Sequence, residues 1–252
     1  MKLKSAIYLM LMLCANALHA GNKIDPPGNN AIRCNGDALS EEECAIDRKD
    51  ALAEGCISQQ ELNTIVSYNG CPVCKKGKYK GWCPVGCFVR GTRILVLDTT
   101  TNQQAWKAIE EVAAATACYR VFALTSDSRL SHLSFSDFAI RFSTIGPENK
   151  PLVSIKTKSG ATLEVTSTHA VVLANGNGVL AETLKIGDEL IDNDGSIDPV
   201  AEIIRPTTDD DVFNIAVETD DVLSHLIVAE GFLVGDQFLQ GSKLLNTTLL
   251  QP

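Results

Sequence analysis

The stretch "CPVGCFVRGTRILVLD" (Cys83–Asp98) joins two different kinds of sequence. Up to Gly86 it is rich in cysteine, proline and glycine, which is typical of turns. From Cys87 onward it becomes a mainly apolar run, which is typical of a buried β-strand. The change falls on the single peptide bond Gly86–Cys87, so we place a domain boundary there. The second domain then begins with a thiol.

The first twenty residues have the layout of a secretory signal peptide. A charged start, "MKLK", is followed by the apolar run "AIYLMLMLCANAL" and by small residues before position 20. The apolar run is shorter than the roughly twenty residues that span a bilayer. We therefore expect a secreted or periplasmic protein without a transmembrane segment. The net charge of −9 disfavours a nucleic-acid partner, because that role usually needs a basic face.

Residues 21–86 are predicted to form a small cysteine-rich module. In an exported chain such cysteine density indicates a disulfide framework, although the sequence leaves the pairing open. Two short helices are expected, over 39–55 and 58–70, because each stretch starts with a serine, carries a glutamate three residues later and ends at a glycine. Residues 70–86 are expected to be turns. The candidate disulfide cysteines are Cys34, Cys44, Cys56, Cys71, Cys74 and Cys83.

Residues 87–236 are predicted to form an all-β domain, which makes the protein mainly β with a small helical module in front. Short β-rich runs follow one another with turn residues between them, and long helical patterns do not interrupt them. "LVSIKT" and "ATLEVT", joined by "KSG", are typical of a hairpin. The remaining residues, 237–252, are assigned to a C-terminal tail that is expected to fray.

A cysteine at the start of a domain can attack the carbonyl carbon that precedes it. The thiol of Cys87 would then take over the acyl group of Gly86, and the amide would become a thioester. Proximity favours such an intramolecular step, and cysteine is intrinsically nucleophilic. The departing amine needs a proton, which a histidine can supply. The candidate is His169, three residues after Thr166, whose hydroxyl could bond the scissile carbonyl or orient the imidazole. The competing interpretation is a histidine packed at a strand end.

Several segments resemble the conserved blocks of the Hint superfamily, the self-processing domains of inteins, bacterial intein-like proteins and hedgehog C-terminal regions. The resemblance runs from Cys87 to Asp236 and implies a Hint-type all-β horseshoe. It also implies catalytic roles for Cys87, Thr166, His169 and His225. The matching segments are "GCFVRGTRILV", "LEVTSTHAVVL", "LKIGDELID" and "VFNIAVETDDVLSHLIVAEGFLVGD".

The closing residues depart from the pattern of splicing inteins, which end in His-Asn followed by Ser, Thr or Cys. Here Gly235, Asp236 and Gln237 stand at those positions, and Asn214 replaces an aspartate that the family often carries. An ionised carboxylate is not an amide nucleophile, and Gln237 has no hydroxyl or thiol to accept an acyl group. The resemblance therefore implies single-turnover autoproteolysis at Gly86–Cys87 rather than splicing. The chain would act on itself, without cofactor or metal, and water or a small external nucleophile would resolve the thioester.

Three alternatives remain open from the sequence. The fold could persist as a non-catalytic exported module. Cys71, Cys74, Cys83 and Cys87 could instead form a structural zinc site, because four thiolates can bind Zn²⁺ tetrahedrally. "CPVC" could be a redox pair, although glycines follow it where a helix is needed. A disulfide from Cys87 to Cys83 or Cys118 would silence the nucleophile.

Overall fold

The computed structural model describes residues 41–252, apart from 68–70, 76–77, 84–86, 149 and 241–246. The predicted signal peptide, Cys34 and Gly86 therefore lie outside the described residues. Within those residues, every helix is too short or too polar to cross a membrane.

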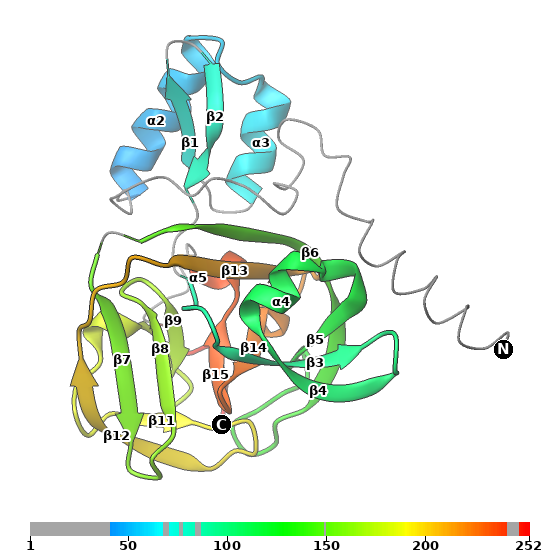
Figure 1. Ribbon diagram of the computed structural model, residues 1–252, viewed down its shortest axis with the longest axis vertical. Coiled ribbons are helices and arrows are strands. Elements are labelled where there is room, and N and C mark those ends of the chain that lie inside the picture. Colours follow the sequence, from blue (N-terminus) through cyan, green and yellow to red (C-terminus); the bar gives the residue numbers. More distant parts are fainter. Residues whose placement is uncertain (1–40, 68–70, 76–77, 84–86, 149, 241–246) are drawn as a thin grey trace, which may run out of the picture.

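The cysteine-rich module contains the two expected helices and a hairpin that the sequence did not predict (Figure 1). The helices are α2 (Glu41–Ala53) and α3 (Gln59–Ser67), and the strands are β1 (Cys71–Lys75) and β2 (Lys78–Cys83). The expectation of turns throughout 70–86 is thus wrong. Proline and glycine in "CPVC" and "KYKGWC" hid the strands, which pair antiparallel from Cys71–Cys83 to Lys75–Lys78 with one irregularity after Val73.

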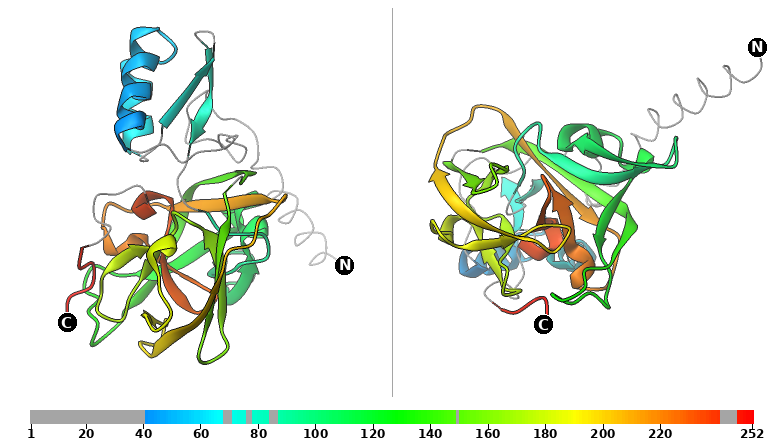
Figure 2. Two further views of the ribbon diagram at one scale, coloured as in Figure 1. Left: turned by 90° about the vertical axis from the view of Figure 1, so that its left-hand side faces the viewer. Right: turned by 90° about the horizontal axis from the view of Figure 1, so that it is seen from below.

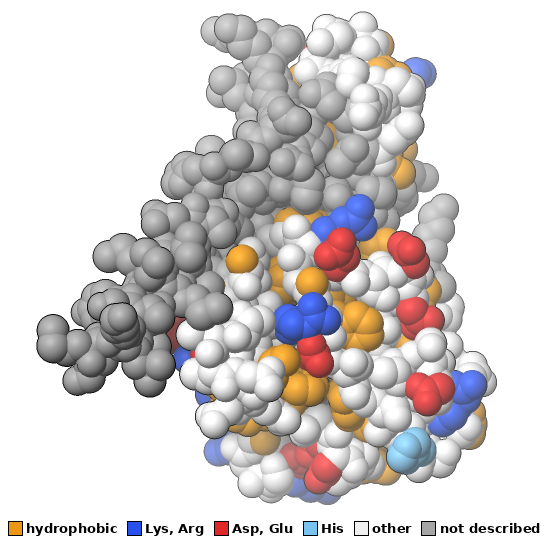
Figure 3. Space-filling model, turned by 90° about the vertical axis from the view of Figure 1, so that its right-hand side faces the viewer, with side chains coloured by type: hydrophobic (Ala, Val, Ile, Leu, Met, Phe, Trp, Pro, Cys, Tyr) orange, Lys and Arg blue, Asp and Glu red, His pale blue; other side chains and the backbone are white. Residues whose placement is uncertain are grey.

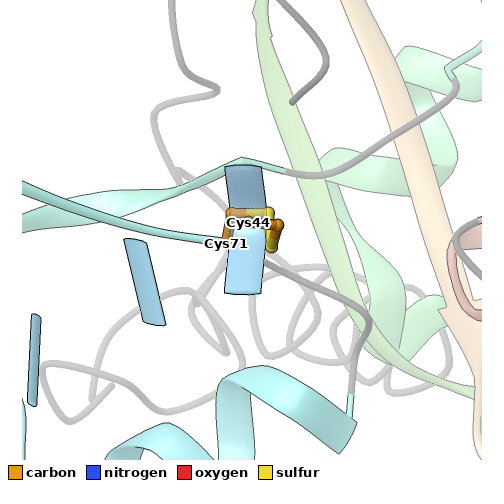
Figure 4. Close-up of a disulfide and its surroundings, with 2 residues drawn as sticks. All are labelled: Cys44 and Cys71. Atoms are coloured by element: carbon orange, nitrogen blue, oxygen red, sulfur yellow. A yellow bond between two sulfur atoms is a disulfide. The ribbon is translucent and has the colours of Figure 1, made fainter. Parts of the chain in front are cut away.

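Two disulfides fasten this hairpin to the helices. Cys44 of α2 bonds Cys71 (Figure 4), and Cys56, between α2 and α3, bonds Cys74. The Cα–Cα distances are 5.3 and 6.2 Å, within the usual disulfide range. A small apolar cluster around Ala51, Ile57 and Ile65 supplies the rest of the core. This cluster buries too little apolar surface to stabilise the module strongly. The disulfides add stability because they restrict the conformations of the unfolded chain.

The second domain is built from two β-sheets, which confirms the mainly β architecture. In order of pairing, the nine-stranded sheet contains β10 (Gly178–Leu180), β9 (Ala170–Val172), β15 (Phe232–Gly235), β14 (Leu226–Ala229), β3 (Arg93–Asp98), β5 (Tyr119–Leu124), β6 (Phe135–Pro147) and β13 (Asp211–Val217), with β4 (Gln103–Ala108) on β3. The four-stranded sheet contains β11 (Glu189–Ile191), β12 (Ile197–Ile204), β7 (Leu152–Thr157) and β8 (Thr162–Thr166).

Helical segments in this domain are short. They are α4 (Ile109–Ala114), α5 (Gln237–Gln240) and the 3₁₀ turns η1 (Thr116–Cys118), η2 (Ala181–Thr183) and η3 (Leu223–His225). Figure 1 shows the four-stranded sheet on one side, β3, β4 and β5 on the other, and β14 and β15 between them. Both sheets curl instead of staying flat (Figure 2).

One hydrophobic core joins the two sheets. Val153 and Val165 of the four-stranded sheet pack in the same cluster as Val96 and Phe213 of the other sheet. Phe88 lies in this cluster, fully buried, and bridges Val165 of β8 and Phe213 of β13. Burying a phenylalanine side chain contributes about 1.5–3 kcal/mol. The first residues of the β domain therefore lie in its core, and the buried Phe88 fixes the position of its neighbour Cys87.

The run 222–234 is a tight hairpin and not one strand. β14 and β15 pair from Leu226–Gly235 to Ala229–Phe232. Glu230 and Gly231, the two residues between the strands, both have positive φ, 51° and 95°. Such turns match the twist of the flanking strands. The Glu230 carboxylate also accepts hydrogen bonds from the guanidinium of Arg93, at 2.7 and 2.9 Å.

Among the described residues after Asp236, α5 and residues 249–250 pack against the domain, which corrects the expectation that the tail frays. Leu239 of α5 and Leu250 are buried in the second apolar cluster of the β domain. The backbone N–H groups of Leu249 and Leu250 donate to the Gly176 carbonyl at 2.8 and 3.1 Å. Side chains of both charges are interspersed on the face shown in Figure 3, rather than gathered by sign.

Candidate functional site

Cys87 is buried at the entry to the β domain. It is fully inaccessible and packs with Leu152, Val212 and Val89. Its thiol is not part of a disulfide, whereas Cys118 is disulfide-bonded. The possible disulfide from Cys87 to Cys83 or Cys118, which would silence the thiol, is therefore contradicted. An apolar setting keeps water away from the sulfur.

The cysteines predicted to share a zinc ion with Cys87 are engaged elsewhere. Cys71 and Cys74 are each bonded to a helix-side cysteine, so neither can supply a thiolate. The four-cysteine zinc site is wrong for this structure. The redox-pair interpretation fails for the same reason, because Cys71 and Cys74 are not bonded to each other. The predicted disulfide roles of Cys44, Cys56, Cys71 and Cys74 are confirmed; Cys34 and the side chain of Cys83 lie outside the description.

Four hydrogen bonds clamp the backbone of Cys87 and Phe88 between β8 and β13. The Cys87 N–H donates to the Thr166 hydroxyl at 2.7 Å, and the Thr166 N–H donates to the Cys87 carbonyl at 3.0 Å. Phe88 exchanges two backbone hydrogen bonds with Phe213, at 2.7 and 2.9 Å. The nitrogen of the Gly86–Cys87 bond is thereby fixed against Thr166. The predicted role of Thr166 at the Gly86 carbonyl stays a prediction, because Gly86 lies outside the described residues.

A tight turn brings His169 back over the end of β8. The His169 N–H donates to the Thr166 carbonyl at 3.0 Å, which explains why a spacing of three residues puts both side chains at one place. The His169 ring is fully buried and its centroid lies 4.3 Å from that of the Phe88 ring. Burial lowers the pKa of His169 to about 3, against the opposing effect of a hydrogen bond with the Cys87 backbone. Cys87, Thr166 and His169 thus meet, as predicted.

This buried, neutral histidine should make stability pH-dependent. The pKa of His169 is lower in the folded chain, about 3, than the ordinary value of 6.5. Between these values the unfolded chain binds more protons, so the free energy of unfolding falls as the pH falls, by at most about 1.4 kcal/mol per pH unit. We expect His169→Leu to flatten this slope between pH 6 and 4. Urea unfolding of both chains across that range is the measurement, and equal slopes would contradict the buried neutral form.

His225 belongs to a different cluster from the one predicted. Its Nδ1 lies 2.8 Å from Asp236 Oδ2, and its ring stacks on Phe238 with centroids 4.1 Å apart. The structure gives it no direct contact with Cys87, Thr166 or His169 among the described residues. Its assignment to the catalytic set therefore remains a prediction, and what the structure supports is a pair with Asp236.

Asp236 is held so completely that it cannot act as a nucleophile. Its Oδ2 also accepts the Val217 N–H at 2.9 Å. Its Oδ1 accepts the N–H groups of Phe238 and Leu239 at 2.9 and 3.2 Å, which makes Asp236 the N-cap of α5. At the preceding position, a Cβ on Gly235 would lie 2.8 Å from the Cβ of Ala170, so the glycine is needed for close packing beside His169. The side-chain oxygen of Asn214 accepts the neighbouring Ile215 N–H.

Sequence reasoning missed Gln240, which contacts His169. Its amide nitrogen lies 3.0 Å from His169 Nδ1 and 3.3 Å from Nε2, and it donates to the Gly235 carbonyl at 2.8 Å. Gln240 lies beyond the segment that resembles the family and in a tail with no pattern of its own. Nothing in the sequence marks it.

No protein-family model and no curated protein matches the chain. Among solved structures it is similar to a bacterial intein-like domain from Clostridium thermocellum, at 22% identity over 60% of this chain and 97% of that one, with a TM-score of 0.46. It is also similar to a DnaB intein from Synechocystis sp. PCC 6803, at 16% identity over 60% of this chain and 98% of that one, with a TM-score of 0.47. A third similar structure is an intein from a hyperthermophile, at 18% identity over 60% of this chain and 99% of that one, with a TM-score of 0.49.

All three are inteins or intein-like. Identities this low do not carry an activity over to this chain. The chemistry of this chain is therefore argued from its own residues.

Proposed function

We propose that the β domain cleaves its own chain at Gly86–Cys87. Cys87 Sγ attacks the Gly86 carbonyl carbon, so that a C–S bond forms and the C–N bond breaks. The thiol loses one proton, and the freed Cys87 amine gains one. Water or a small external nucleophile then attacks the thioester, which releases residues 21–86 and restores the thiol. The reaction is a single turnover on the chain itself.

The observation that carries the proposal is the clamp on the Cys87 nitrogen. The Thr166 hydroxyl holds this N–H at 2.7 Å, and His169 bonds the backbone of the same residue. A departing nitrogen beside a hydroxyl and an imidazole has the groups that proton transfer needs within reach. A held geometry of this kind lowers the barrier of an intramolecular attack.

The same geometry supports cleavage without splicing. Splicing needs a second break at the end of the domain, where Asp236 accepts several hydrogen bonds and caps α5. The oxygens of this carboxylate are engaged in these hydrogen bonds. Leu239 and Leu250, which follow Asp236, are buried in the domain, as residues of a released segment would not be. The domain is therefore proposed to act only at its N-terminal junction.

The test is release of the module by hydroxylamine, which attacks thioesters and leaves disulfides intact. Because Cys118 is disulfide-bonded, the disulfides are reduced after the hydroxylamine treatment; we then expect the chain from residue 21 to yield two fragments by intact mass, 21–86 with a C-terminal hydroxamate and 87–252. Cys87→Ala should stay full length, and Ser131→Ala, at an exposed residue, should cleave like the parent chain. If the parent chain also stays intact, the β domain is a non-catalytic module and the proposal fails.

A further inference from the structure

Gln240 reaches the centre of the proposed site from outside the intein-like segment. Its side chain is buried, and within the described residues its oxygen Oε1 has no hydrogen-bond partner. Its nitrogen Nε2 is shared between the His169 ring and the Gly235 carbonyl. The tail thus contributes a polar group to a histidine that is otherwise surrounded by apolar side chains.

The Gly235 carbonyl decides which end of the amide faces the imidazole. A carbonyl only accepts, so the amide nitrogen must point toward Gly235, and this same nitrogen then lies against His169. Turning the amide over would put two oxygens together at 2.8 Å. The group that faces the imidazole is consequently a hydrogen-bond donor.

A donor beside an imidazole requires a ring nitrogen that carries no proton. A hydrogen bond between the His169 ring and the Cys87 backbone raises the pKa of His169. A hydrogen bond with this effect is one that a ring N–H donates to the Cys87 carbonyl. The Gln240 nitrogen lies within 3.3 Å of both ring nitrogens. A ring that carried protons on both nitrogens would face this donor with two more donors.

Three further contacts hold Gln240 in this place. Asp236 caps α5, and Leu239 is buried beside Gly235. Farther along, the tail crosses Gly176, where a Cβ would lie 2.1 Å from the Leu250 carbonyl oxygen. Because Gly176 leaves room for that approach, residues 249–250 dock tightly. The amide is therefore presented by a fixed element.

We propose that Gln240 is a positioning residue that adds to the effect of burial in keeping His169 neutral, and that it thereby slows the cleavage reaction. The inference rests on the proposed function. A neutral ring can protonate the departing amine only by giving up its one proton, whereas an imidazolium can do so readily. An acceptor in place of the donor should favour the imidazolium and accelerate release of the module.

The experiment compares Gln240→Glu, which replaces the donor with an acceptor, and Gln240→Met, which removes the donor without adding charge. Both are first made with Cys87→Ala, so that no cleavage is needed, and the ¹⁵N spectrum of the His169 ring is recorded at pH 6. We expect a neutral ring with Gln240, an imidazolium with Gln240→Glu, and, as the pH is lowered, a Gln240→Met ring that gains its second proton at a higher pH than the parent's. An unchanged ring in folded variants would overturn the proposal.

The second measurement uses chains with Cys87 intact and follows hydroxylamine release from pH 5 to 8. Gln240→Glu should release the module at least about tenfold faster at pH 6–7, with its rate profile displaced to higher pH, and a rate equal to the parent's would overturn the proposed brake. If Gln240→Glu does not fold, the pH at which the His169 ring of Gln240→Met becomes protonated decides, and a value equal to the parent's would overturn the proposal. A parent chain that never cleaves refutes the proposed function, while the spectra still judge the role of Gln240.

Discussion

Replacing His169 with leucine is expected to lower the rate of Cys87-dependent cleavage by about 10²–10⁴-fold, the usual worth of a positioned acid or base. The ring lies fully buried beside Phe88 and bonds the backbone of the cysteine whose nitrogen must leave. Leucine fills a similar volume and suits the apolar surroundings, so the fold should persist. The release of residues 21–86 by hydroxylamine, followed by mass over time, measures the change.

The matched control is His132→Leu, at an exposed histidine to which neither the sequence nor the structure gives a role. It should cleave like the parent chain. Thr166→Val removes the hydroxyl at the Cys87 nitrogen while keeping the β-branched shape. It therefore measures the contribution of Thr166 to the cleavage rate separately from that of His169. An unimpaired rate in His169→Leu would leave the imidazole as a packing residue, which is the competing interpretation of the sequence.

Much of the fold could be predicted from patterns of apolar residues and turns. The two helices of the module and the mainly β architecture follow from capping serines, glycines and short apolar runs. The hairpin of β1 and β2 could not be predicted, because proline and glycine in its strands are typical of turns and because the disulfide pairing that joins it to α2 and to the α2–α3 connection cannot be inferred from the sequence. The turn at Glu230–Gly231 was missed because glutamate rarely adopts positive φ.

The candidate site was predictable only where its residues are close in sequence or belong to a recognised block. Thr166 and His169 are joined by one turn, and Cys87 marks a change of composition. His225 was assigned to the same cluster, but its contacts depend on where β14 and β15 place Asp236. Gln240 meets His169 only because α5 folds back over Gly235. Such a contact comes from tertiary packing, and no local spacing encodes it.

Replacing Asp236 with alanine is expected to lower the free energy of unfolding by about 3–5 kcal/mol, the cost of breaking a buried charged network from one side. The carboxylate is fully buried, and the change leaves His225 and the N–H groups of Val217 and Phe238 without their acceptor. Urea unfolding measures the loss. Asp220→Ala, at an exposed aspartate nearby, should change stability by no more than about 0.5 kcal/mol.

Asp236→Asn distinguishes the helix cap from the pair with the histidine. Asparagine keeps one oxygen, which can still accept the N–H groups of Phe238 and Leu239, but its NH₂ would face the Val217 N–H. The loss should then fall to about 1–3 kcal/mol, the cost of one unsatisfied buried group. Because the cap begins the helix that carries Gln240, Asp236→Ala should also free the His169 ring, whereas Asp236→Asn should not. Equal losses in the two variants would show that α5 does not depend on this cap.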